Sequence, residues 1–393
     1  MERKIYPKIL EIKNLKKAAQ RIKQAIKQKE HIILYGDSDL DGVCSVIILQ
    51  ETLLSLGGNI SALYFPDREQ EGYGITKTAL ERLKPHAPGL LISMDLGITN
   101  FEEIRQARSI GFKVILVDHH EILSVLPEAD IIVDPKQPGE TYPFHGFAAC
   151  GLTLRLALLL LSKEASPALI SGLKELAALA TVADMMPRKE DNLQIIQEGL
   201  ATMGSSWRPG IKAFERFEEF KRIKSVEVRI TQMIALLNVR DVEHGIPAAY
   251  RVLASHAEQE AVDLLSVLQE KHKIRKDNIR LYAERVRSSL VRAPLPVVIF
   301  EGDESFDYIL LGSVASIISQ EYNVPAFIYK RGELEGIGSV RAPSGYDTVK
   351  AMKACAPLLL TYGGHAQASG FRLPNANLEK FKDCLIEYFT NHE

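Results

Sequence analysis

Residues 31–42 read His-Ile-Ile-Leu-Tyr-Gly-Asp-Ser-Asp-Leu-Asp-Gly, an apolar run that ends in three aspartates at alternate positions. An apolar run of strand length that stops at a glycine and continues into a helix-like segment indicates the carboxyl edge of a sheet, where open α/β sheets bind ligands. In an extended or tight-loop backbone Asp37, Asp39 and Asp41 share one side and can converge. Converging carboxylates repel one another unless a cation lies between them. The alternative is an Asx-rich loop that caps the helix beginning at Gly42.

Two further apolar runs end in polar residues of the same kind. Residues 90–94 run into Asp95, and residues 114–117 run into Asp118, His119 and His120. Buried carboxylates and imidazoles need partners, and a metal ion would supply them for the whole group. The sequence therefore indicates a metal site at one edge of a sheet.

Asp184 lies inside an almost wholly apolar segment, Thr181-Val-Ala-Asp-Met-Met-Pro187. A buried carboxylate without a partner costs several kcal/mol, so Asp184 must meet a cation, a hydrogen-bond donor or a metal. A helix cap at a chain reversal is the alternative. Together with the other aspartates and His119, Asp184 is predicted to join the metal site.

Length and composition describe a globular protein of more than one domain. The 393 residues suggest two domains and a helical element between them, and 46% hydrophobic with 25% charged residues is ordinary for a soluble protein. A net charge of -2 gives no overall basic footprint, so any contact with nucleic acid must come from local patches. The first residues contain no apolar stretch of signal-peptide length, and the longest apolar run, 156–161, is too short to cross a bilayer. We expect a cytoplasmic protein.

The four cysteines, Cys44, Cys150, Cys355 and Cys384, are far apart and form no C-x-x-C pair. This spacing argues against a zinc knuckle or a disulfide framework and favours reduced thiols.

Hydrophobic periodicity predicts alternating strands and helices in the first half of the chain. We expect strands over 31–36, 60–65, 90–94, 112–117 and 131–133, with helices over 12–30, 43–56 and 100–109. Strands and helices alternating at this interval predict a doubly wound parallel sheet. Residues 147–163 and 172–204 are apolar at helical spacing.

The composition changes after residue 204. Residues 205–292 are polar and charged and predict a long exposed linker helix, whose basic cluster Lys271-His-Lys-Ile-Arg-Lys276 suits either a nucleic-acid backbone or a solvated face. A second α/β unit follows, with strands predicted over 297–300, 309–311, 326–329 and 336–341 and a helix near 314–321.

Three stretches suggest contacts with a phosphate. Arg68, followed by Gly72-Tyr73-Gly74, suits a loop that brings a guanidinium and a flat ring to a phosphate or base, although a tight turn with a surface ion pair explains it too. Gly338-Ser339-Val340-Arg341 offers a hydroxyl beside a guanidinium. Gly363-Gly364-His365 allows close backbone approach, and the small residues after it predict a helix start suited to a phosphate.

These motifs together resemble the DHH phosphoesterase superfamily, and within it the RecJ-like single-strand exonucleases. Four motifs stand in the family's order: Asp37-Ser-Asp-Leu-Asp-Gly42, Asp95 in Met-Asp-Leu-Gly-Ile, Asp118-His-His120, and Asp184 in Thr-Val-Ala-Asp. The C-terminal block with Gly338–Arg341 and Gly363–His365 is similar to the DHH-associated substrate domain. The resemblance covers residues 30 to 385. It departs at residues 237–241, where the family's longer Gly-rich stretch carries an Arg that contacts a 5′ phosphate and this chain has Arg240.

The resemblance implies a set of site residues. Two divalent cations, Mn²⁺ or Mg²⁺, are expected to share Asp95 and to be ligated besides by Asp37, Asp39, Asp41, His119 and Asp184. Asp95, Asp118 and His120 are the implied catalytic residues, with His120 orienting or protonating phosphate oxygens and Asp118 fixing the histidines. The implied substrate contacts are Arg68, Tyr73, Ser339, Arg341, Gly363, Gly364 and His365.

The expected architecture is a doubly wound α/β DHH domain over 1–204, a helical linker over 205–292 and a smaller α/β substrate domain over 293–393, with the active site in the cleft between the two domains. Bacterial members carry an OB-fold beyond the substrate domain, and we expect none within these residues.

The resemblance implies hydrolysis of single-stranded DNA or RNA from an end to mononucleotides, 5′ to 3′, in DNA repair, recombination or replication. Two alternatives stay open: a phosphodiesterase for short oligonucleotides or cyclic dinucleotides, and a binding protein of the replisome. Replication or repair proteins are further expected partners.

Overall fold

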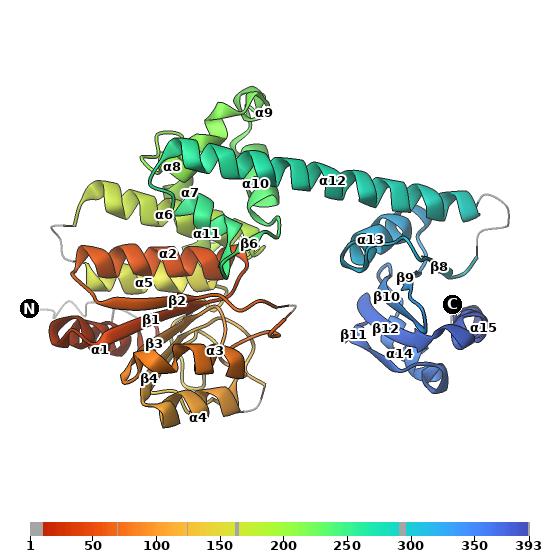
Figure 1. Ribbon diagram of the computed structural model, residues 1–393, viewed down its shortest axis with the longest axis horizontal. Coiled ribbons are helices and arrows are strands. Elements are labelled where there is room, and N and C mark those ends of the chain that lie inside the picture. Colours follow the sequence, from red (N-terminus) through yellow and green to blue (C-terminus); the bar gives the residue numbers. More distant parts are fainter. Residues whose placement is uncertain (1–10, 69, 124, 162–164, 291–295, 392–393) are drawn as a thin grey trace, which may run out of the picture. The chain divides into compact units, whose positions relative to one another are not determined.

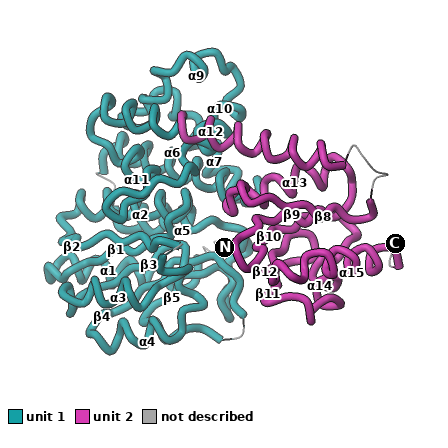
Figure 2. The backbone as a smooth tube through the Cα atoms, turned by 45° about the vertical axis from the view of Figure 1, so that its right-hand side comes forward, with its two compact units in different colours: residues 1–269 teal, residues 270–393 magenta. Residues whose placement is uncertain are grey.

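The computed structural model describes residues 11–68, 70–123, 125–161, 165–290 and 296–391. The chain divides into two compact units, residues 1–269 and residues 270–393 (Figures 1 and 2). The N-terminal residues 1–10, the last residues of the helix predicted over 147–163 and the predicted boundary at 292/293 lie outside the described residues.

The first unit is built on a five-stranded parallel sheet with the order β2-β1-β3-β4-β5 (Figure 1). Its strands are β1 (His31–Gly36), β2 (Ile60–Tyr64), β3 (Gly89–Met94), β4 (Phe112–Val117) and β5 (Ile131–Val133). The sheet confirms the predicted α/β fold. Gly36 pairs with Met94, and Met94 pairs with Val117, so the three central strands end at the same level.

Alternate residues of β1 enter two different cores, as expected for a strand covered on both faces. Ile32 and Leu34 lie in the core that includes α1, α2 and α5, whereas Ile33 and Tyr35 lie in the core that includes α3 and α4. These helices are α1 (Leu15–Gln28), α2 (Leu40–Ser55), α3 (Lys77–Leu83), α4 (Phe101–Ile110) and α5 (Ala149–Leu160), with a 3₁₀ turn η1 (Lys84–His86) after α3.

Further helices add to the α2–α5 side of this unit. They are α6 (Pro167–Ala183), α7 (Glu190–Met203), α8 (Pro209–Lys212), η2 (Ala213–Arg216), α9 (Glu218–Arg222), α10 (Val226–Leu237) and α11 (Ala248–Leu253), with a small hairpin of β6 (Val242–Glu243) and β7 (Ile246–Pro247). Within the predicted linker, Phe214, Phe220 and Leu265 are buried in the core of the first unit. The long helix α12 (Glu258–Leu290) follows (Figure 1).

The second unit contains a mixed five-stranded sheet with the order β11-β12-β10-β9-β8. Its strands are β8 (Ile299–Asp303), β9 (Ala326–Arg331), β10 (Glu335–Arg341), β11 (Thr361–His365) and β12 (Ala368–Pro374), and its helices are η3 (Tyr308–Leu310), α13 (Leu311–Tyr322), α14 (Thr348–Ala354), η4 (Ala356–Leu358), η5 (Asn375–Asn377) and α15 (Leu378–Asn391). Only β8 and β9 pair in parallel. One face packs Val340 with residues of α14 and α15, and the other packs Ile328 with residues of α12 and α13.

Two local predictions in the second unit are wrong. Residues 309–311, predicted as a strand, form the end of η3 and the start of α13, because the Asp307 carboxylate accepts a hydrogen bond from the backbone N–H of Ile309 (3.0 Å) and starts a helical turn. Gly363-Gly364-His365, predicted at a helix start, lies in β11 and pairs antiparallel with β12. Gly364 has a φ of 129°, and a Cβ there would lie 2.6 Å from the carbonyl oxygen of Ala368, so the hairpin needs glycine at this position.

The expectation of four reduced thiols is also wrong. Cys355 at the end of α14 is bonded to Cys384 in α15, while Cys44 and Cys150 are free and buried. The two bonded residues are 29 positions apart, a separation that carries no pattern in the sequence. No helix in the described part of the chain is long and apolar enough to cross a membrane.

Candidate metal centre

The residues that follow β1, β3 and β4 lie together because adjacent parallel strands end at one edge of the sheet. Asp37 follows β1, Asp95 follows β3, and Asp118, His119 and His120 follow β4. Asp184 reaches the same place as the C-terminal cap of α6. The backbone of Asp95 is left-handed, with a φ of 66°, which is uncommon for a residue other than glycine.

The first turn of α2 positions two more aspartates. The Asp39 carboxylate caps the helix by accepting hydrogen bonds from the N–H groups of Asp41 (3.1 Å) and Gly42 (3.2 Å). The two oxygens of Asp41 accept hydrogen bonds from the N–H groups of Ala149 (2.7 Å) and Cys150 (2.9 Å), in the first turn of α5. A Cβ at Gly42 would lie 2.5 Å from the nitrogen of Asp37, so only glycine lets these two segments approach. The expected Asx cap and the proposed metal ligands are thus the same residues.

Asp118 organises the histidines. Its Oδ1 accepts hydrogen bonds from the backbone N–H groups of His119 (2.8 Å) and His120 (3.2 Å) and lies 2.8 Å from Nδ1 of His120. Its Oδ2 accepts a hydrogen bond from the N–H of Ile98 (3.0 Å). Burial alone would raise the pKa of Asp118, but the hydrogen bond and charge of His120 outweigh it and lower that pKa. The same hydrogen bond raises the pKa of His120.

Three carboxylates surround one imidazole nitrogen. Nε2 of His119 lies 3.2 Å from Asp95 Oδ1, 3.6 Å from Asp184 Oδ2 and 3.8 Å from Asp41 Oδ2. Asp41, Asp95 and His119 are almost fully buried, and Oδ2 of Asp184 has no hydrogen-bond partner among the described residues. Carboxylates packed this closely in a largely buried site are stabilised by a cation among them.

The pKa values of these groups reflect the same close packing of buried carboxylates. Burial, followed by the charges of Asp41 and Asp39, raises the pKa of Asp95 well above its usual range. The same causes raise the pKa of Asp184 to about 7. Burial lowers the pKa of His119 and favours its neutral form, which is the form that binds metal.

The possible metal-ligand atoms that lie within 4.8 Å of one another belong to three groups of residues. They are Asp37, Asp39 and Asp95; Asp41, His119 and Asp184; and Asp95, His119 and His120. Carboxylate oxygens with one or two imidazole nitrogens fit Mn²⁺, and the all-oxygen group also fits Mg²⁺. The six predicted ligands are therefore brought together in a set that can hold divalent cations, and His120 lies within reach of the same ions.

Arg68 and Tyr73 lie beside this cluster. Arg68 pairs with Asp37 (2.6 Å) and Asp39 (2.9 Å), and its guanidinium carbon lies 5.4 Å from the centre of the Tyr73 ring. The Tyr73 hydroxyl lies 3.3 Å from Nε2 of His120. The ion pair that the sequence left as an alternative for Arg68 is present, and it involves two of the expected metal ligands.

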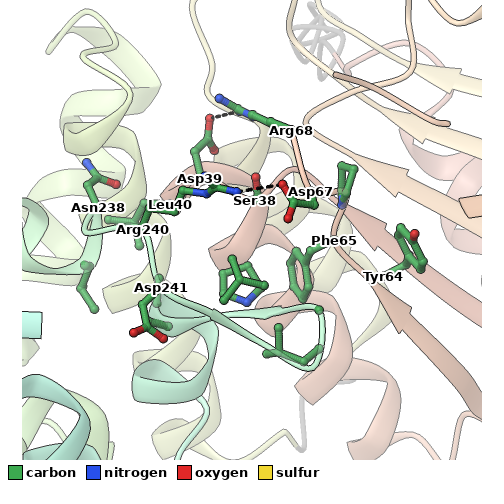
Figure 3. A pocket seen from close by; sticks show the side chains of 18 of the residues that line it. Ser38, Asp39, Leu40, Tyr64, Phe65, Asp67, Arg68, Asn238, Arg240 and Asp241 are labelled. Carbon is green, nitrogen blue, oxygen red and sulfur yellow. Dashed lines mark hydrogen bonds and ion pairs between the residues drawn. The ribbon is translucent and has the colours of Figure 1, made fainter. Parts of the chain in front are cut away.

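A pocket of about 950 Å³ opens next to the cluster within the first unit (Figure 3). Asp39, Asp41 and Asp184 line it, together with residues 237–242 and 244–249. Arg240 donates a hydrogen bond to Asp67 (2.9 Å) and lines the same pocket (Figure 3).

The sequence stretch that begins at Asp134 resembles a segment of the RecJ-like proteins, but sequence reasoning gave Asp134 no role in the site; it follows β5 as Asp118 follows β4. Asp134 is fully buried, its Oδ1 accepts a hydrogen bond from the N–H of Lys136 (2.7 Å), and its Oδ2 has no hydrogen-bond partner among the described residues. Burial raises its pKa to about 7, and the charge of Asp118 adds to this shift. A polar residue directly after a short apolar run was the available signal.

The other predicted substrate residues lie in the second unit, and all of them except Gly364 share one face of its sheet. Arg341 and His365 both pair with Ala368, and Ser339 and Gly363 both pair with Gly370, so their side-chain positions share one face. Val340 points to the opposite face, into the core with α14 and α15. Arg341 also lines a smaller pocket of about 280 Å³ with Ser316 and Ser319 of α13.

Sequence comparison identifies two known domains. Residues 31–183 match the N-terminal domain of the DHH family, and residues 294–391 match the DHHA1 domain. The single-stranded-DNA-specific exonuclease RecJ of Bacillus subtilis (strain 168) is 32% identical over 386 residues, which are 97% of this chain and 48% of that protein. The chain thus spans about half the length of the curated relatives it matches first.

Solved structures give the same result. The crystal structure of exonuclease RecJ bound to manganese superposes with a TM-score of 0.80 at 26% identity, covering 98% of this chain and 97% of that one. RecJ of Thermus thermophilus in complex with Mn²⁺ gives a TM-score of 0.76 at 25% identity, covering 98% and 56%.

Aspartates and histidines lie close together at the ends of parallel strands in this fold. This arrangement is typical of a protein that binds divalent cations. The chain contains a DHH-family N-terminal domain at residues 31–183 and a DHHA1 domain at residues 294–391, and RecJ proteins are among its relatives.

Proposed function

We propose that the chain is a metal-dependent phosphodiesterase that hydrolyses single-stranded nucleic acid, DNA in the first place, from its 5′ end to mononucleotides. We assign it to DNA repair, recombination or replication in the cytoplasm. The observation that carries the proposal is the contact of one imidazole nitrogen of His119 with three carboxylates at 3.2–3.8 Å. The names of the related proteins support single-stranded DNA as the substrate.

Two groups of ligands would hold two cations. Asp37, Asp39 and Asp95 form the first group, and Asp41, His119 and Asp184 form the second. Asp95 Oδ1 lies 3.2 Å from His119 Nε2, so Asp95 stands at the contact between the groups and suits the bridging role. When bound, Mn²⁺ or Mg²⁺ would supply a hydroxide near neutral pH and neutralise charge on the phosphate.

His120 is suited to proton transfer. Its Nδ1 lies 2.8 Å from Asp118 Oδ1, and this hydrogen bond raises the pKa of His120, which favours the protonated ring. Its Nε2 faces the exposed Tyr73 hydroxyl and can give a proton to the leaving oxygen of a phosphodiester. Asp118 positions this ring and the His119 backbone.

The second unit offers a phosphate site of its own. The side-chain positions of Ser339 and Arg341 on β10 and of His365 on β11 share one face of the sheet. A guanidinium with a neighbouring hydroxyl binds phosphate through paired charge-assisted hydrogen bonds. We propose that these residues, together with Gly363 and Gly364, bind phosphate groups of the single-stranded nucleic acid.

The test is hydrolysis of end-labelled strands by the purified protein with Mn²⁺, Mg²⁺ or EDTA. Substrates are DNA and RNA of several lengths, labelled at either end, together with short di- and trinucleotides and a cyclic dinucleotide. Release of labelled mononucleotide from 5′-labelled long DNA at the earliest times supports the proposal. Cleavage of the short substrates alone would replace it with an oligonucleotide phosphodiesterase, and binding without cleavage under all metal conditions would replace it with a binding protein.

A further inference from the structure

A short turn in the second unit, directly before α13, exposes two large side chains. Tyr308 and Ile309 are 53% and 55% exposed, and they form η3 together with buried Leu310. Two adjacent exposed apolar side chains form a small patch that a ligand can cover.

Contacts on both sides of this turn fix its conformation, so the exposure of Tyr308 and Ile309 is a property of the fold. Phe306 on its N-terminal side is buried, with its ring centre 4.7 Å from that of Tyr282. The Tyr282 hydroxyl donates a hydrogen bond to the carbonyl of Ser305 (3.1 Å), and Asp307 caps the turn at Ile309. Because these contacts fix both ends of the turn, Tyr308 and Ile309 could become buried only if the contacts were broken.

The turn leads directly to Arg341. A Cβ at Gly312 in the first turn of α13 would lie 3.1 Å from Nη2 of Arg341 and 3.8 Å from the Ser339 hydroxyl. Gly312 is four residues after Tyr308, which is one helical turn. The exposed ring therefore belongs to a residue about one turn before Gly312, which is next to a guanidinium and a hydroxyl that share a face of the sheet.

We propose that Tyr308 and Ile309 form a stacking platform for a nucleobase of single-stranded nucleic acid whose phosphate lies at Arg341. This inference rests on the proposed function and adds a base contact to it. Single strands are bound by combining positive charge along the backbone with aromatic side chains on which bases stack. Stacking tolerates every base, so the platform would grip a strand without reading its sequence.

The test is binding of a 5′-phosphorylated oligothymidylate that carries 2-aminopurine at its first position, measured in EDTA so that the strand stays intact. Tyr308→Ala is expected to weaken binding by about 5- to 100-fold in fluorescence anisotropy, as for the loss of one stacked base. The 2-aminopurine fluorescence, quenched on binding to the wild type through stacking, should stay high on the Tyr308→Ala variant at saturation. Tyr308→Phe keeps the ring and should retain both the affinity and the quenching.

Leu334→Ala is the matched control, because Leu334 is an exposed apolar residue of the same unit (84%) that directly precedes β10, at the opposite end of that strand from Arg341. It should leave binding unchanged. Wild-type affinity and quenching in Tyr308→Ala would overturn the platform while leaving the proposed function intact. A change of oligomeric state in Tyr308→Ala with unchanged strand binding would assign the pair to a protein contact and also overturn it. A wild type that neither binds nor cuts single strands would remove the proposed function itself.

Discussion

Nε2 of His119 lies 3.2 Å from Oδ1 of Asp95, although the two residues follow different strands and are 24 positions apart. This contact links the group Asp37, Asp39 and Asp95 to the group Asp41, His119 and Asp184. Because both residues are buried, the charge of a cation bound by one group would act strongly on the other group.

Replacing Asp95 with Asn should abolish hydrolysis and reduce bound Mn²⁺. The amide keeps the size of the side chain but removes the charge that faces both groups, so the fold should persist. Elemental analysis and isothermal titration measure the metal, and circular dichroism checks the fold. Wild-type turnover with unchanged metal content would refute the shared role of Asp95.

His119 and His120 should respond differently to alanine. His119→Ala removes the nitrogen that faces three carboxylates and should lower metal occupancy. His120→Ala should keep the metal and lose rate by roughly two to four orders of magnitude, as expected for a general acid. Equal metal loss in both variants would make His120 a ligand, which its grouping with Asp95 and His119 also permits.

Arg341→Ala tests the phosphate site of the second unit. If Arg341 holds a 5′ phosphate, wild-type protein should cut 5′-phosphorylated strands faster than 5′-hydroxyl strands, and the variant should lose most of that difference while binding metal normally. The measurement is kcat/KM for both strands, with Leu334→Ala as the control. A preference that survives in Arg341→Ala would exclude this residue from end recognition.

Much of the metal centre could be predicted because its residues follow apolar runs that form neighbouring parallel strands. The proximity of Asp37, Asp95 and Asp118 could be predicted from two facts alone: each follows a predicted strand, and adjacent parallel strands end at one edge of the sheet. The contact of Asp41 with Ala149 and Cys150 could not be predicted, because it joins positions 108 and 109 residues apart and depends on how α5 packs on α2.

The second unit was harder to predict from the sequence. Every residue of β11 is exposed, so it lacks the alternation of polar and apolar residues that marks a half-buried strand. Ile309–Leu311 is a three-residue apolar run that fits a strand or a helical turn equally well, and the Asp307 cap decided between them.

Arg208 should be a large determinant of stability. It is 2% exposed and donates hydrogen bonds to both Glu51 oxygens (2.7 and 2.9 Å) and to the carbonyl of Leu253 (3.0 Å). Arg208→Met leaves the Glu51 carboxylate unpaired and should reduce the free energy of unfolding by about 3–5 kcal/mol.

Urea unfolding measures this effect, and two further variants define its cause. Arg208→Met combined with Glu51→Leu should recover much of the loss, because no charge is then left without a partner. Arg216→Met breaks the exposed Arg216–Glu258 pair and should cost less than about 1 kcal/mol. Equal losses at Arg208 and Arg216 would contradict the importance of burial.

Asp134 should make the metal-free protein less stable as the pH rises. The pKa of Asp134 is raised to about 7 by burial, whereas its usual value is 3.8. Between these two pH values the folded state binds more protons than the unfolded state, so the free energy of unfolding falls with increasing pH and levels off above about pH 7. Asp37, Asp41 and Asp95 have raised pKa values as well and act in the same direction.

Asp134→Asn isolates the contribution of this one residue. The amide imitates the protonated acid and cannot ionise, so the fall in stability between pH 5 and 8, measured by urea unfolding in EDTA, should be shallower by about 1 kcal/mol per pH unit over the range where Asp134 titrates. Asp277→Asn is the control, since the Asp277 side chain is 59% exposed, and it should leave the slope as in the wild type. The same slope in Asp134→Asn and the wild type would mean that Asp134 is ionised throughout this range, and its buried Oδ2 would then require a bound partner such as water or a cation.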